Sequence, residues 1–290
     1  MVKPMRPFSF FIMSFVYFLL LFIITIISSS NNNTIDLSAA NIPLLKIIQC
    51  ITVILVFILP SLIFAQLFHP DRLRFFHLNR APSFKAVAFG VLFILCAVPL
   101  IGFLEELNKH FSLPQELSRI EDWMRKSEEN VAQIEKAFMD AYTVPNLIGN
   151  LVVIALFAAI SEELFFRGLL QGALMGIFKN THIAVWSTAL LFSAFHLQFF
   201  GFIPRVILGA ILGYAYCWTG SLWTNIFMHF INNGIVLVLD FLIHTKVLPD
   251  WVDKIGMENT PGIFLWVSSS ILASGLCGWF LYKSRLHVAE

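Results

Sequence analysis

Long apolar runs separated by short polar segments dominate the chain. A helix needs about 20 mostly apolar residues to cross the hydrocarbon layer of a bilayer, which is roughly 30 Å thick. Runs that reach or approach this length cover residues 8–28, 42–67, 84–104, 145–177, 182–200, 203–219, 221–244 and 262–282. The pattern predicts an all-α fold, a polytopic membrane helix bundle of about eight transmembrane helices.

The first run could also be read as a cleaved signal peptide, because basic residues precede it. Its apolar stretch of about 20 residues is longer than the 7 to 15 residues typical of a signal peptide. No cleavage site of small residues is evident before the Ser and Asn tract near Asn31. We therefore expect an uncleaved first membrane helix.

One segment departs from the apolar pattern. Of the 37 charged residues (19 basic and 18 acidic), 14 lie between Glu105 and Asp140, nine acidic and five basic, which gives a net charge of −4. Apolar residues recur among them at steps of three, four and seven, as on one face of a helix: Leu117, Ile120, Met124, Val131, Ile134 and Phe138. We expect an amphipathic surface helix between spans three and four. It could act as a lid or substrate guide, but we favour an interfacial helix that merely covers apolar span ends.

These features divide the chain into four regions. Residues 1–104 form an N-terminal three-helix membrane region, 105–144 the acidic surface segment, 145–245 a membrane core, and 246–290 a loop and the last membrane helix. Basic residues near span ends fall on one side of the membrane: Lys3, Arg6, Arg72, Arg74, Arg80, Lys85, Lys179, Lys283 and Arg285. We therefore expect both termini in the cytoplasm and, in a bacterium, the protein in the inner membrane.

Composition supports the membrane interpretation. Hydrophobic residues make up 58% of the chain and charged residues only 13%, against about a quarter charged in soluble domains. A net charge of +1, with basic residues only at the ends of apolar runs, excludes a nucleic-acid partner. The four cysteines lie far apart within apolar runs, which indicates neither a metal motif nor a disulfide framework.

Glycines recur at four-residue steps in two of the runs, at Gly168, Gly172 and Gly176 and again at Gly209 and Gly213. In lipid this spacing lets helix backbones approach each other closely. We expect tight helix packing at these positions.

Three motifs place polar side chains inside the last five apolar runs. An ionisable group in hydrocarbon costs about 2.5 to 3.5 kcal/mol on the insertion scale unless it is paired or wet, so such groups indicate a functional site. A purely structural polar network is the alternative. The motifs are SEELFFRG with Glu162, Glu163 and Arg167, FSAFH with His196, and HFINN with His229 and Asn233.

Helical spacing relates these residues to one another. Glu163 and Arg167 are four apart with the acid first, the favourable order for an ion pair within a helix. Glu162 lies about 100° around the helix from Glu163, so it is free to face a separate cavity. His229 and Asn233 are also four apart and share one helical face.

The same residues fall at comparable depths in the membrane. At about 1.5 Å per residue from the cytoplasmic helix ends, Glu162 lies roughly 22 Å deep, His196 roughly 21 Å, Asn233 roughly 18 Å and His229 roughly 12 Å. Three helices of alternating direction need not agree in this way. The agreement predicts one shared site near the midplane.

Read in order, the motifs are EExxxR, FxxxH from Phe192 to His196, and HxxxN from His229 to Asn233. Together they resemble the CAAX protease and bacteriocin-processing enzyme (CPBP/Abi) family, which includes the Ras-converting type of CAAX prenyl endopeptidase. The resemblance covers roughly residues 145–245, about a third of the chain. It implies an eight-helix membrane fold with an internal aqueous chamber. It also implies an intramembrane endopeptidase that cuts near the C-terminus of a membrane-associated, possibly lipidated, protein or peptide.

The resemblance also implies roles by motif position. Glu162 would be the general base, His196 would hold and polarise the water, His229 and Asn233 would stabilise the tetrahedral oxyanion, and Glu163 with Arg167 would be the supporting pair. No cofactor is required in this assignment, which we favour.

A zinc ion bound by Glu162, His196 and His229, with water in the fourth position, is the alternative. HExxH is absent from the sequence. An Asn one turn after a His also suits an oxyanion donor better than a zinc ligand.

Two functions of other classes stay open. A non-catalytic membrane scaffold or bacteriocin-immunity-type binding protein would hold a peptide or another membrane protein in the same chamber. A proton-coupled carrier would use glutamate and histidine as a relay, but no inverted repeat supports it. The intact set of polar residues favours the protease, because a binding chamber needs no base and oxyanion donors together.

Overall fold

The structure is a computed structural model that describes residues 7–30, 37–38, 40–252, 255 and 260–284. Lys3, Arg6, Arg285 and the Ser/Asn tract near Asn31, which entered the expectations above, lie outside these residues. Within the described residues all regular elements are helices. In chain order they are α1 (Pro7–Ser30), α2 (Ile42–Val53), η1 (Ile54–Ile58), α3 (Leu59–Phe68), α4 (Arg72–Phe75), α5 (Phe84–Lys109), η2 (Gln115–Leu117), α6 (Ser118–Met139), α7 (Val144–Asn150), η3 (Leu151–Phe157), α8 (Ala158–Glu162), η4 (Glu163–Gln171), α9 (Gly172–Phe178), α10 (Thr181–Phe195), η5 (Phe199–Gly201), α11 (Phe202–Thr219), α12 (Leu222–His244) and α13 (Ile263–Lys283).

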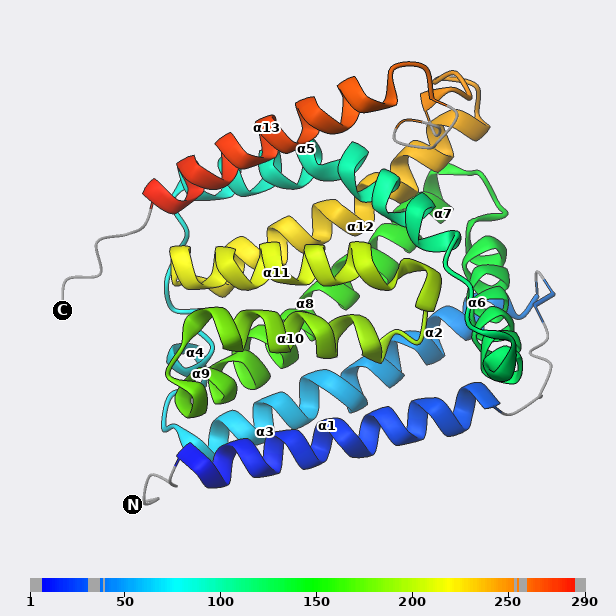
Figure 1. Ribbon diagram of the computed structural model, residues 1–290. Coiled ribbons are helices and arrows are strands. Elements are labelled where there is room, and N and C mark those ends of the chain that lie inside the picture. The colour runs from blue at the N-terminus through cyan, green and yellow to red at the C-terminus, as the bar shows by residue number, and fades with distance from the viewer. Residues whose placement is uncertain (1–6, 31–36, 39, 253–254, 256–259, 285–290) are drawn as a thin grey trace.

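The long helices run side by side as one bundle, and α6 lies across one end of it (Figure 1). α13 packs along α5, α11 packs along α10, and α12 contacts both α5 and η3. The first turn of α1 and the last turn of α13 lie at the same end of the bundle, opposite α6, but on its two outer sides. The predicted amphipathic surface helix is thus present as α6.

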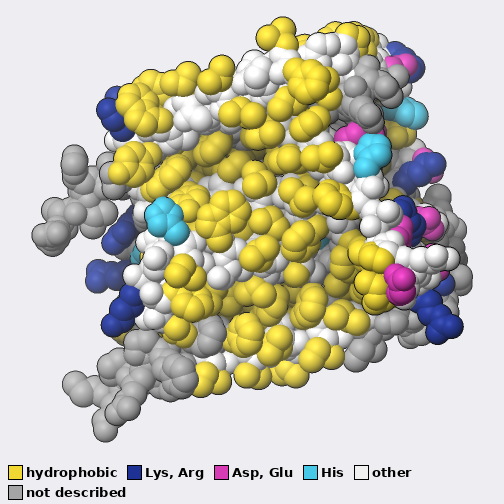
Figure 2. Space-filling view, in the orientation of Figure 1, with side chains coloured by type: hydrophobic (Ala, Val, Ile, Leu, Met, Phe, Trp, Pro, Cys, Tyr) yellow, Lys and Arg dark blue, Asp and Glu magenta, His cyan; other side chains and the backbone are white. Residues whose placement is uncertain are grey.

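Six helices are long and apolar enough to cross a membrane, among the residues described: Ile42–Phe68, Phe84–Lys109, Val144–Phe178, Phe199–Thr219, Leu222–His244 and Ile263–Lys283. The other two expected spans are helical as well, with shorter described apolar stretches at Ile12–Ile24 and Thr181–Phe195. Figure 2 shows a broad band of hydrophobic side chains between two charged edges. The all-helical membrane fold is confirmed, and the full number of eight spans stays a prediction.

The fifth expected span ends earlier than predicted. The expectation was a helix over 182–200, but α10 ends at Phe195 and His196 is its C-cap. Leu197 has a φ of +51°, and this left-handed conformation cannot continue an α-helix of L-residues. His196 therefore lies at the start of the loop to α11, residues 196–201, which includes the single turn η5, and not inside α10.

Two of the long helices contain π-helical segments, η1 between α2 and α3, and η3 and η4 within the helix that runs from α7 to α9. Such segments are rare and often occur at functional sites. Glu162 is the last residue of α8 and Glu163 the first of η4. The helix therefore changes its winding at the two adjacent glutamates.

A serine repairs the hydrogen bonding of α5 where Pro99 interrupts it. Ser270 of α13 donates to the carbonyl oxygen of Cys96 over 2.6 Å and accepts from the Leu100 N–H over 3.2 Å. Its hydroxyl thus bridges the groups that a regular helix would join directly next to a proline. In lipid such backbone groups need a partner within the protein, and this one fastens α13 to α5.

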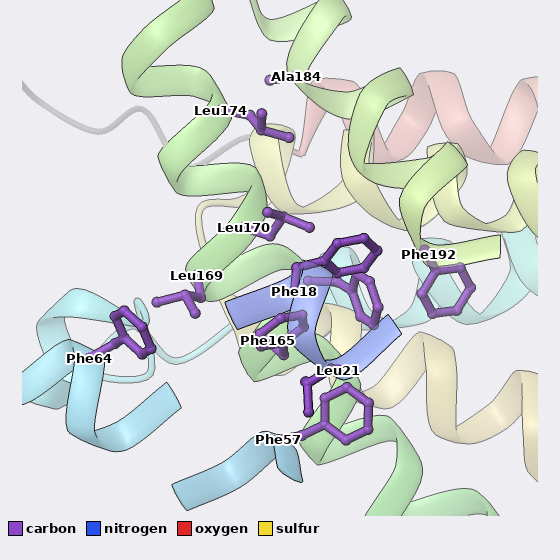
Figure 3. Packing of buried hydrophobic residues seen from close by; sticks show 11 residues of the cluster. Phe18, Leu21, Phe57, Phe64, Phe165, Leu169, Leu170, Leu174, Ala184 and Phe192 are labelled. Carbon is purple, nitrogen blue, oxygen red and sulfur yellow. The ribbon is translucent and has the colours of Figure 1, made fainter. Parts of the chain in front are cut away.

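Aromatic rings join the N-terminal helices to the core (Figure 3). Phe165 and Phe166 of η4 have no exposed surface and pack with Phe18 of α1 and Phe57 of η1. Phe57 meets Phe165 edge to face with ring centroids 5.5 Å apart, and Phe166 meets Phe192 in the same way at 5.1 Å. Such pairs add about 0.5 to 1.5 kcal/mol to the burial of the rings, and they hold η4 against α10.

The glycines that recur at four-residue spacing differ in how closely other atoms pack against them. A Cβ at Gly209 would lie 3.1 Å from the Ala189 backbone, and one at Gly213 would lie 2.9 Å from Gln171 and Val185 atoms. Close packing is therefore confirmed in α11, and it is confirmed at Gly168 of η4, where a Cβ would lie 2.5 Å from Phe76 Cδ1. At Gly172 it is wrong, because nothing lies within 4 Å of a Cβ built there.

Candidate active site

Glu163 is fully buried and receives hydrogen bonds from three side chains. Arg167 Nη1 donates to its Oε1 over 2.7 Å, and Asn225 Nδ2 donates to its Oε2 over 3.2 Å. His229 Nδ1 lies 2.8 Å from Oε1. The expected pair of Glu163 and Arg167 is present, with no exposed surface on either side chain. A buried charge pair needs such additional hydrogen bonds to offset its desolvation.

Arg167 also fastens η4 to α11. Its Nη2 donates to the Gly209 carbonyl over 3.2 Å, and its guanidinium carbon lies 4.7 Å from the centre of the Phe192 ring. One turn later, Gln171 donates to the Gly213 carbonyl over 3.1 Å. The small residues of α11 thus let two polar side chains of η4 reach its backbone.

Glu162 lies between two histidines. Its Oε2 is 3.9 Å from His196 Nε2 and 3.7 Å from His229 Nε2. This oxygen is buried and has no hydrogen-bond partner among the residues that the structure describes. A buried oxygen without a partner is unusual and is typical of a position that receives water, an ion or a substrate.

The other nitrogen of each imidazole fixes the orientation of the ring. His196 Nδ1 lies 2.8 Å from the Phe192 carbonyl oxygen, which can only accept, so Nδ1 carries the proton. His229 Nδ1 lies 2.8 Å from Glu163 Oε1, which likewise accepts as a carboxylate. Both Nε2 atoms are therefore directed at Glu162.

Asn233 differs from the other predicted residues. It is half-buried, and its amide oxygen accepts a hydrogen bond from Asn232 Nδ2 over 3.1 Å. Among the described residues no hydrogen bond joins Asn233 to Glu162, His196 or His229. Its place in the site rests on its position one turn after His229 in α12.

Sequence reasoning missed Asn225. This side chain is fully buried and donates to Glu163 Oε2 and, over 2.6 Å, to the Leu212 carbonyl. The sequence spacing could have identified it, because Asn225, His229 and Asn233 follow one another at four-residue steps on one face of α12.

The residues around Glu162 include the donor types that zinc prefers, one carboxylate and two imidazoles. Ligands about 2.0 to 2.1 Å from a tetrahedral zinc ion lie about 3.3 Å apart. The separations of 3.7 and 3.9 Å are wider. No group of three or more His, Cys, Asp or Glu side chains is close enough to hold a metal within the described ranges. The present arrangement does not fit zinc unless the side chains close in.

The helices and the buried polar cluster define an integral multi-pass membrane protein with a site of two glutamates and two histidines. Residues 144–235 match the family described as Type II CAAX prenyl endopeptidase Rce1-like, and they form a domain of that family. The resemblance expected from the three motifs is thereby confirmed.

A similar protein is the Uncharacterized protein YpbD of Bacillus subtilis (strain 168). It is 31% identical over 106 residues, which make up 35% of this chain and 49% of that protein. The matched part thus spans about half the length of the relative. No solved structure gives a match.

Proposed function

We propose that the protein is an intramembrane endopeptidase that cleaves a peptide bond near the C-terminus of a membrane-associated protein or peptide by a glutamate-activated water. The observation that carries the proposal is the unpartnered Oε2 of Glu162, which faces the Nε2 atoms of His196 and His229. The family of the domain at residues 144–235 supports the same reaction class.

The geometry around Glu162 suits the activation of water. A water molecule at hydrogen-bond distance, about 2.8 Å, from Glu162 Oε2 is also within reach of a histidine Nε2 at 3.7 or 3.9 Å from that oxygen. Glu162 takes one proton of the water while His196 orients it. A general base in such a position contributes about 100- to 10,000-fold to the rate.

The remaining steps use the residues of α12. As the water oxygen bonds to the carbonyl carbon, negative charge develops on the carbonyl oxygen. His229, when its Nε2 carries a proton, and the Asn233 amide donate to that oxygen. Glu162 then returns its proton to the amine nitrogen as the C–N bond breaks, so no covalent intermediate with the enzyme is needed.

Glu163 and Arg167 support the site without reacting. Because both are fully buried and paired, Glu163 is not available as a base. Its contact with His229 Nδ1 directs the imidazole toward Glu162. Two adjacent carboxylates thus have separate roles that their surroundings assign.

The orientation that we propose places the end of the bundle opposite α6 in the cytoplasm. Arg72, Arg74, Lys85, Lys179 and Lys283 lie at the ends of helices on that side, as the positive-inside rule requires. A charged thiol reagent added to intact cells is expected to label Glu129→Cys in α6 and not Lys179→Cys.

The deciding experiment replaces Glu162 by Gln, which keeps the size of the side chain and removes the base. Purified wild type in proteoliposomes is presented with a library of prenylated and unprenylated C-terminal peptides, and cleavage is followed by mass spectrometry. We expect Glu162→Gln to lower kcat/KM by about 100- to 10,000-fold with an unchanged melting temperature. Glu129→Ala, an exposed change in α6, is the control.

Three results would contradict the proposal in different ways. Cleavage by Glu162→Gln at the wild-type rate would exclude Glu162 as the base. Activity that disappears with a chelator and returns with stoichiometric zinc would make Glu162, His196 and His229 metal ligands. Failure of folded wild type to cleave any peptide would favour the non-catalytic scaffold or immunity-type protein.

A further inference from the structure

The part of the loop that directly follows His196, residues 197–201, has an unusual backbone. Leu197 adopts a φ of +51° although it carries a branched side chain, and only 4% of its surface is exposed. Leucine rarely takes this conformation, and it persists only where surrounding contacts impose it. The contacts that impose it therefore influence where His196 lies.

Four side chains from outside the loop bind four successive residues of its backbone. The carbonyl oxygens of Leu197, Gln198 and Phe199 accept hydrogen bonds from Ser127, Arg205 and Asn108, over 3.5, 2.9 and 2.7 Å. The N–H of Phe200 donates to Glu128 Oε2 over 3.1 Å. Leu197 and Phe200 are buried, and buried peptide groups need such partners because they do not reach water.

Two of these four partners belong to α6, and the same helix adds ring contacts. The Trp123 ring lies 5.3 Å from the Phe199 ring, and the Arg125 guanidinium lies 4.5 Å from the centre of the Phe200 ring. Ser127 is polar but only 5% exposed, because it faces the loop. α6 is thus attached to the segment that follows His196, which is more than the covering of apolar span ends requires.

We propose that Glu128 is a positioning residue that sets the place of His196 relative to Glu162. The inference rests on the proposed function and names a residue that the three family motifs do not contain. Among the described residues, the His196 ring has one hydrogen bond, from Nδ1 to the Phe192 carbonyl of α10. On the other side its backbone continues into the loop, where Glu128 accepts from a backbone N–H that is nearly buried, since Phe200 is 9% exposed.

The hydrogen bond and the charge of Glu128 are separable by substitution. Glu128→Gln keeps the length and an acceptor oxygen, whereas Glu128→Asp keeps the charge but withdraws the acceptor by one methylene. Glu128→Ala removes both. Glu129→Ala removes the same charge one position along the helix, where the side chain is exposed, and is the matched control.

Activity in proteoliposomes gives the first test. A misplacement of a catalytic group by about 1 Å lowers the rate by up to about 100-fold. We expect Glu128→Ala and Glu128→Asp to lower kcat by about 10- to 100-fold with KM nearly unchanged, and Glu128→Gln to restore most of the wild-type kcat. Rescue of kcat by Asp and not by Gln would overturn the proposal. The loss of activity would then come from the missing charge and not from the missing bond to the Phe200 N–H.

A second measurement does not depend on cleavage. Diethyl pyrocarbonate modifies exposed imidazole nitrogens, and mass spectrometry gives the rate at His196, whose side chain is 27% exposed. We expect several-fold faster modification in Glu128→Ala and Glu128→Asp, and wild-type rates in Glu128→Gln and Glu129→Ala. Wild-type rates in all four variants would overturn the proposal.

The two measurements also separate this inference from the proposed function. If Glu162→Gln abolishes cleavage while all Glu128 variants behave as wild type, the function stands and the positioning role fails. If no peptide is cleaved by any variant, the function fails, and the modification of His196 still decides whether Glu128 positions it. Should Glu128→Ala not fold, the Gln and Asp variants carry the comparison.

Discussion

Two glutamate–arginine pairs in this protein have the same spacing but different surroundings. Glu163 and Arg167 in η4 are 2.7 Å apart, and neither side chain has exposed surface. Glu121 and Arg125 in α6 are 2.6 Å apart, and 49% of the Arg125 side chain is exposed. The four-residue step brings acid and base together in both cases, but it does not set the energy of the contact.

The surroundings decide what each pair does. In the bundle, removal of one partner leaves an uncompensated charge in a medium that solvates it poorly, so the pair is essential even where it adds little net stability. On α6, water and salt screen the same contact. We therefore expect the buried pair to control folding and the exposed pair to control only the local order of α6.

The largest expected effect is that of Arg167→Met, which deletes the charge opposite Glu163, the hydrogen bond to the Gly209 carbonyl of α11 and the contact with the Phe192 ring of α10. Breaking one partner of a buried pair costs about 3 to 5 kcal/mol. Thermal unfolding in detergent is expected to show a much lower melting temperature, whereas Arg125→Met is expected to shift it only slightly.

A double variant sharpens this prediction. If the cost comes from an unpaired charge, Glu163→Gln combined with Arg167→Met should be less unstable than the sum of the two single variants. Equal shifts for Arg167→Met and Arg125→Met would show that burial does not distinguish the two pairs.

Sequence reasoning succeeded where a short-range rule determines the structure. The Glu163–Arg167 pair, the amphipathic helix within residues 105–144 and the starts of most membrane helices follow from spacing and hydrophobicity. The proximity of His196 and His229 to Glu162 also agrees with the depths counted along the helices.

Sequence reasoning failed where contacts between distant segments decide. α10 ends at Phe195 and not at residue 200, because side chains of α5, α6 and α11 hold the following loop in a conformation that Leu197 would not take by itself. The role of Asn225 depends on Glu163, 62 residues earlier in the chain. No local pattern contains that information.

Glycine substitutions give an intermediate effect and test the same contrast between interior and surface. A Cβ at Gly213 would lie 2.9 Å from Val185 Cγ1 and from Gln171 Oε1, and Gln171 is itself bonded to the Gly213 carbonyl. We expect Gly213→Ala to cost about 1 to 3 kcal/mol, as overpacking usually does, and to lower the melting temperature.

Gly172→Ala is the matched control, because it has the same chemistry and nothing lies within 4 Å of the new methyl group. Alanine is the better helix former by about 1 kcal/mol, so the melting temperature should be unchanged or higher. Loss of stability in Gly172→Ala equal to that of Gly213→Ala would mean that space around the glycine is not the cause.

The smallest expected effect concerns pH and the exposed pair. Arg125 donates to Glu121 Oε1 through Nη2 and Nε, over 2.6 and 3.1 Å, and the Leu113 N–H donates to Oε2 over 2.9 Å. These bonds, first that from Arg125 and then that from Leu113, hold the pKa of Glu121 below its ordinary value of 4.5. A carboxyl group with a lower pKa in the folded state stabilises that state above its unfolded pKa, and the contribution is lost as the pH falls through the folded pKa. The first turn of α6 should therefore loosen below about pH 4.5 while the buried pair is unaffected.

Hydrogen exchange, corrected for the intrinsic effect of pH, should show reduced protection of the Leu113 amide at low pH in wild type and in Glu129→Gln. Glu121→Ala, which removes the acceptor oxygen, should have low protection at every pH. Protection of Leu113 that does not change with pH in wild type would show that the Glu121 carboxylate does not hold the start of α6.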